Sequence, residues 1–124
     1  MIAIDHVIGK IAQATRGDRE IDYMIALVMG WKRIEKEAPG TGRQSRPLWL
    51  VPSGKEEAKV PTYTSNLQEA YMLALQVAPH TPAGCAWERH QASAQIEGQP
   101  PFIAATPILA LCGASLTLKK AQMS

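Results

Sequence analysis

The fold is decided first by the stretch DREIDYMIALVMGW, residues 18–31, which carries the start, the apolar face and the end of one helix. Asp18 is a typical N-cap, because its carboxylate accepts a free backbone N–H at the positive end of the helix dipole. Apolar residues then recur three and four positions apart, at Ile21, Met24, Ile25 and Val28. Gly30 supplies the left-handed residue that ends many helices, and Trp31 follows it.

Length and composition favour a single domain over residues 1–124, with 46% apolar residues and no sign of intrinsic disorder. The net charge of +2 is too small to indicate a polyanion partner by itself. Cys85 and Cys112 lie in apolar stretches, so we expect reduced core cysteines of a cytoplasmic protein rather than a disulfide. Neither a targeting signal nor an apolar run of the ~20 residues of a membrane span is evident.

The remaining chain alternates further helices with short strands. We predict helices over residues 2–15 and from a Ser65–Gln68 capping box to Pro79, strands at 47–52, 85–89 and 92–97, and a last helix opening at Thr106-Pro107. This αα-β(β)-α-ββ-α order predicts an α+β fold, in which about four helices pack against a small antiparallel sheet of short strands.

The predicted third helix has an unusually broad apolar surface. One face carries Leu67, Ala70, Tyr71, Ala74 and Val77, and Met72, Leu73 and Leu75 widen it. Such a helix is expected to be covered on more than one side. We therefore predict that a second copy of the chain or a protein partner covers part of it.

Three segments, in order, resemble the three motifs of the phage ABA sandwich domain, a family of small proteins encoded in phage and prophage genomes. They are residues 19–31, residues 60–71 and residues 105–112, and the resemblance covers positions 19–120. Asn66 and Tyr71 stand where the family commonly has aspartate and often tryptophan. The resemblance implies a sheet layered between helices and a phage-derived accessory protein in the cytoplasm of a bacterial host. It implies no catalytic residue, because the family has no established activity.

The residues that could carry chemistry are few and poorly spaced. His80, Cys85, His90 and Cys112 are of zinc-ligand type but lack a chelating pair, and thiols in apolar surroundings are inert. Asp18, Glu20 and Asp22 lie in a first helical turn, where the dipole and solvent explain them. We therefore predict no enzyme activity, metal, cofactor or small-molecule substrate.

A basic segment is the best candidate for a ligand site. Lys32, Arg33, Lys36, Arg43 and Arg46 stand against two acidic residues, and Trp31 and Trp49 flank them. Phosphate contacts from these cations, with Trp49 stacking on a base, would make a nucleic-acid-binding module. The alternative is a solvated loop whose tryptophans anchor the core. We expect binding to protein, or self-association, and keep nucleic-acid binding as the alternative.

Overall fold

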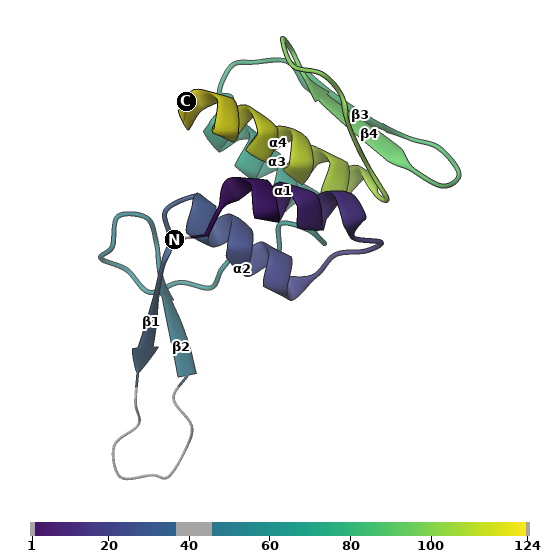
Figure 1. Cartoon of the computed structure of the whole chain (residues 1–124). Helices are drawn as coiled ribbons and strands as arrows, with labels where there is room; N and C mark the ends of the chain where they lie inside the picture. The colour runs from purple at the N-terminus through teal and green to yellow at the C-terminus, as the bar shows by residue number, and fades with distance from the viewer. Residues whose placement is uncertain (1, 37–45, 124) are drawn as a thin grey trace.

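The chain forms helices that pack against one face of a small three-stranded sheet, and two further strands form a separate hairpin (Figure 1). The structure, a computed structural model, describes residues 2–36 and 46–123. Its elements in order are α1 (Ile4–Gln13), α2 (Arg19–Val28), β1 (Lys32–Lys36), β2 (Arg46–Leu50), α3 (Leu67–Val77), β3 (Ala83–Trp87), β4 (Ala92–Ile96), β5 (Phe102–Ala104) and α4 (Pro107–Met123). The predicted α+β class is confirmed, and the element order differs from the prediction by one additional strand, β5.

The ends of α2 follow the local chemistry of its sequence. The Asp18 carboxylate accepts a hydrogen bond from the Glu20 backbone N–H at 2.8 Å. At the other end Gly30 has φ 98°, and its N–H donates to the Leu27 carbonyl while the Trp31 N–H donates to Ala26. This pair of bonds is a Schellman motif, so the predicted stop signal is confirmed.

The other helix caps agree with the prediction to within one residue. Thr106 caps α4, accepting from the Leu109 N–H at 3.1 Å. For α3 the cap is Asn66 rather than Ser65, because the Asn66 side chain accepts from the Glu69 N–H at 3.1 Å. An amide oxygen serves this position as well as a hydroxyl does, which moves the helix start by one residue.

The strands of the described ranges form two antiparallel sheets rather than one. In the first, β1 pairs with β2 from Lys32 opposite Leu50 to Lys36 opposite Arg46. In the second, β4 lies between β3 and β5. We did not predict β5. The sequence of β1 lacks the alternation of apolar residues that is typical of a strand, and this strand forms by pairing with β2 rather than by burial of one face.

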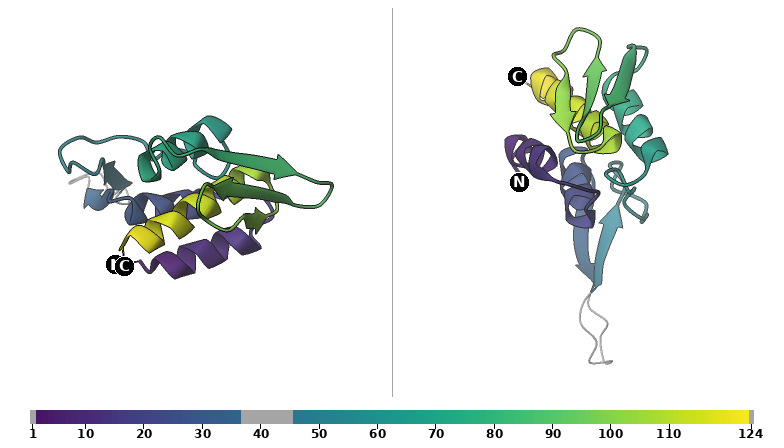
Figure 2. Two further views of the ribbon diagram at one scale, coloured as in Figure 1. Left: turned by 90° about the horizontal axis from the view of Figure 1, so that it is seen from above. Right: turned by 90° about the vertical axis from the view of Figure 1, so that its right-hand side faces the viewer.

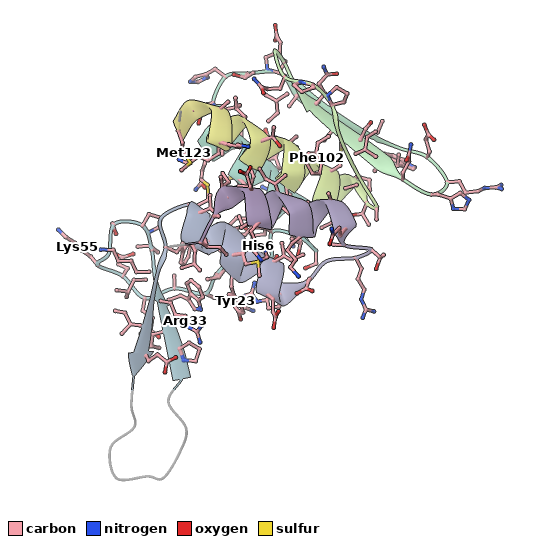
Figure 3. The ribbon with its side chains drawn as sticks, in the orientation of Figure 1. His6, Tyr23, Arg33, Lys55, Phe102 and Met123 are labelled. Atoms are coloured by element: carbon pink, nitrogen blue, oxygen red, sulfur yellow. The ribbon has the colours of Figure 1, made fainter. Side chains whose placement is uncertain are left out.

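Helix α4 lies at the centre of the core and packs against α1, α3 and the three-stranded sheet. All eight residues from Leu109 to Leu116 are buried, so several layers cover this helix and not one face alone. Gly113 is required there, since a Cβ at this position would lie under 3.0 Å from three ring carbons of Phe102 (Figure 3). The described ranges contain no helix with the length and hydropathy of a membrane span.

The three-stranded sheet is covered on one face only. The inward residues of β4, Ala92, Ala94 and Ile96, are buried against the helices, whereas Gln95 on the outer face is exposed. The resemblance to the phage ABA sandwich domain implies helices on both faces, and the described residues place none on the outer one.

Candidate functional site

The basic segment lies on the β1–β2 hairpin, which projects away from the helices (Figure 2). Lys32 and Arg33 are exposed, and as neighbours in a strand they point to opposite faces. The Arg33 guanidinium lies 3.5 Å from the Glu35 carboxylate, which offsets part of its charge (Figure 3). The described cations therefore do not gather on one face.

Three further cations belong to the predicted basic segment. Lys36 and Arg46 are register partners at the end of the hairpin, and nothing is described of their side chains. Arg43 lies outside the described residues. The pairing thus brings two basic residues opposite each other at the end of the two strands.

Trp49 does not fit the nucleic-acid prediction. Its side chain is 9% exposed, and its ring stacks on Tyr23 with centroids 5.2 Å apart and planes 9° apart. The Arg19 guanidinium lies over the Tyr23 ring, 4.7 Å from its centroid. Because the ring is buried against α2, it is not free to stack on a base, and the alternative reading as a core anchor holds.

A buried polar cluster joins α2 to the segment before α3. Asp22 is 1% exposed, and its Oδ1 accepts from the Thr64 hydroxyl at 2.6 Å and from the Thr64 N–H at 2.8 Å. Arg19 donates to Asp22 at 3.1 Å and also to the carbonyls of Val60 and Pro61. The prediction that solvent explains Asp22 is therefore wrong, because tertiary packing buries it with a full set of donors.

This cluster holds the segment before α3 against α2. Within the described ranges, every buried side-chain nitrogen or oxygen has a hydrogen-bond partner. A satisfied buried carboxylate fixes the position of a segment and leaves no group free for a substrate. Gly17 lies at the same contact, where any Cβ would meet Thr64 and Ser65 under 3.0 Å.

The two cysteines have opposite environments. Cys112 is fully buried, and its thiol donates to the Tyr63 carbonyl at 3.2 Å. Burial raises the pKa of this thiol well above its usual range, and its predicted position in the core is confirmed. Cys85 is exposed, so its prediction as a core residue is wrong. The described residues contain no group of three or more potential metal ligands.

An apolar groove lies between α3 and the strand β3. It has a volume of about 570 Å³, and its walls include Leu67, Tyr71 and Leu75 from the helix and Ala83, Cys85 and Ile96 from the sheet. Leu67 and Tyr71 are 53% and 51% exposed, although the sequence placed them on the buried face of the helix. The face of α3 that is buried instead carries Ala70, Leu73, Ala74 and Val77.

In the described part of the chain, β3 stays exposed on the face that points toward the helices. Its residues Ala83, Cys85 and Trp87 pair with the buried Ile96, Ala94 and Ala92 and so point to the same side. Every residue of β3 is nevertheless exposed, and Trp87 is 74% exposed. The strand is exposed because the β3–β4 hairpin extends beyond the helices (Figure 1).

Sequence reasoning missed this site for an identifiable reason. The broad apolar surface of α3 led us to predict a partner or a second copy on this helix, but Leu67 and Tyr71 were assigned to its main apolar face and Cys85 to the core. The residues of α3 and β3 are exposed because α3 lies beside the sheet rather than under it.

Comparison of the chain with protein-family models, with curated proteins and with solved structures gives no match.

Proposed function

We propose that this protein acts by binding protein, through the groove between α3 and β3. The observation that carries the proposal is an exposed apolar surface formed by two adjoining elements, with Trp87, Leu67 and Tyr71 each at least half exposed. Contiguous exposed apolar surface of this kind is typical of protein interaction sites. Tyr71 in the groove wall and Trp87 on the adjoining strand are of the residue types that dominate binding energy.

The chemistry of the groove supports a protein ligand. Its lining is mostly apolar, with Gln68 and Thr81 as polar groups. Beside it, β3 is the outermost strand of its sheet, so alternate backbone N–H and C=O groups point outward. A groove next to an open strand edge is the arrangement in which an added strand binds through its backbone and inserts alternate side chains.

The resemblance to the phage ABA sandwich domain adds an origin to this proposal. We propose an accessory protein of phage or prophage origin, acting in the cytoplasm of a bacterial host by association and not by catalysis. The position of the gene among replication, packaging or tail genes would test the origin independently of the groove.

The binding proposal is tested by panning a library of short peptides against the sparsely immobilised chain. We expect selected peptides with alternating apolar residues, whose affinity falls at least tenfold in Tyr71→Glu. Gln76→Glu is the matched control, because it adds the same charge to an exposed position of α3 outside the groove lining. If no peptide is selected and the chain does not associate with itself, the proposal is overturned.

Nucleic-acid binding by the β1–β2 hairpin is the second candidate, favoured by the projection of this hairpin and by exposed Lys32 and Arg33. Fluorescence anisotropy with labelled single- and double-stranded DNA at low salt tests it. Binding that weakens steeply with salt and is lost in a Lys32→Glu/Arg33→Glu variant would support it. No binding at tens of micromolar protein would exclude it.

A further inference from the structure

We infer that the occupant of the groove is a second copy of this chain, joined edge to edge through β3. The inference rests on the proposed function and names its partner. Two β3 strands pair antiparallel about a twofold axis at Cys85 and make one six-stranded sheet. Trp87 of each copy then lies over the groove of the other copy.

The two edges of the three-stranded sheet differ in a way that favours β3. The β5 edge has three residues, follows Pro100 and Pro101, and lies against α1. Short length and cover by a helix are usual devices that prevent pairing of an edge strand. The β3 edge also follows a proline, Pro82, but it has five residues and contains neither a charge nor a proline itself. It is the open edge of this sheet.

The sequence of β3 is self-complementary in the register that pairs all five residues. This register places Cys85 opposite Cys85, Gly84 opposite Ala86, and Ala83 opposite Trp87. Residues directly opposite each other in an antiparallel pair point to the same face. The indole of Trp87 therefore lies beside Ala83 of the second copy, and Ala83 is part of the groove wall.

Extending the same register beyond the strand brings no like charges together. Glu88 would lie opposite Pro82, and Arg89 opposite Thr81. Like charges directly opposite in a sheet are destabilising, and their absence permits the pairing. The helices stay on one face of the combined sheet, because the twofold axis runs perpendicular to it.

The exposed apolar area is sufficient for a stable dimer. A large aromatic side chain presents about 150–250 Å² when fully accessible. At 74% and 51% exposure, Trp87 and Tyr71 would together contribute roughly 250 Å² per copy, and Leu67 and Leu75 roughly 100 Å² more. A standard interface buries about 800 Å² per partner, of which somewhat more than half, roughly 450 Å², is apolar. The small residues of β3, which are all exposed, would add to this area.

The test uses the full chain and measures its mass by light scattering from low to several hundred micromolar. We expect a species of twice 13.5 kDa. Cys85→Lys, an exposed position, places two lysines opposite each other at the axis and should give the monomer at all these concentrations. Ile103→Lys is the matched control, since it adds the same charge to the exposed surface of the other edge strand and should leave the dimer intact.

The register is tested by mild oxidation of the wild-type chain. Opposite residues in an antiparallel pair have Cα atoms 4.5–5.5 Å apart, within the range that a disulfide can bridge. We expect a Cys85–Cys85 disulfide dimer that forms at low protein concentration and is lost on Trp87→Ala. A monomeric wild-type chain, or a dimer that Cys85→Lys leaves intact, overturns the inference. A monomer that still selects groove-binding peptides overturns the second copy as occupant while leaving the proposed function in place.

Discussion

Replacing Gly113 with alanine tests how closely α4 packs against the sheet. In an exposed helix interior, glycine is about 0.5–1 kcal/mol less favourable than alanine, so the substitution would ordinarily stabilise. At Gly113 the new methyl group overlaps the ring of Phe102 from β5. Adding a methyl to a packed core costs about 1–3 kcal/mol, and a ring that must shift as a rigid unit favours the upper part of that range. We expect a net loss of about 2 kcal/mol.

The chain offers a matched control for this change in α1. Gly9 is also inside a helix, but a Cβ built there meets no heavy atom within 4 Å. Gly9→Ala should therefore raise stability by about 0.5–1 kcal/mol, opposite in sign to Gly113→Ala. Urea unfolding followed by circular dichroism measures the free energy of unfolding of both variants. In thermal unfolding, at roughly 4 °C per kcal/mol, the melting temperatures of the two variants should differ by about 10 °C.

A double-mutant cycle assigns the cost to the ring. In a Phe102→Leu background the obstructing Cε1 and Cζ atoms are removed and the shorter, flexible side chain can turn aside, so Gly113→Ala should become neutral or stabilising. The coupling between the two positions should then be about 2 kcal/mol, as is typical of residues in direct contact. The reasoning is refuted if Gly113→Ala stabilises the wild-type chain as Gly9→Ala does, or if its cost is unchanged in the Phe102→Leu background.

Three further predictions concern buried groups. Thr64→Val removes the hydroxyl bonded to Asp22 and should cost about 2 kcal/mol in urea unfolding, whereas Thr64→Ser keeps that hydroxyl and should cost much less. A thiol reagent should modify Cys85 at once but Cys112 only on unfolding, and equal rates would contradict the burial of Cys112. Burial raises the pKa of Tyr63 from 10.0 to about 12, so its contribution to stability is full below pH 10 and is lost as pH rises through 12. Tyr63→Phe should flatten this part of the profile, and an unchanged loss between pH 10 and 12 would assign it to other groups.

The helix ends were predictable because their chemistry is local. Asp18, Gly30 and Thr106 each act on backbone groups within four residues, so their roles can be deduced from neighbouring positions alone. At α3 the boundary shifts by one residue, because Asn66 replaces Ser65 as the capping side chain, and α1 spans Ile4–Gln13 rather than residues 2–15. The α+β class followed from the order of these elements.

The sites of contact were not predictable in the same way. The sequence pattern of Asp22 is that of a solvated first-turn residue, yet Thr64, 42 positions later, closes over it. In the same manner, Trp49 becomes buried because Tyr23 of α2 lies against it. Both outcomes depend on segments that meet only when the chain is folded.

By itself, the sequence determined where helices begin and end, since capping and apolar periodicity act within one or two helical turns. It also determined that α3 carries more apolar surface than one contact can bury. Only the tertiary structure decided which side of α3 faces α4 and which lines the groove, and that β3 is an open edge with Cys85 and Trp87 exposed. The physical reason is that apolar periodicity records how much surface must be covered, whereas long-range packing selects which neighbour covers it.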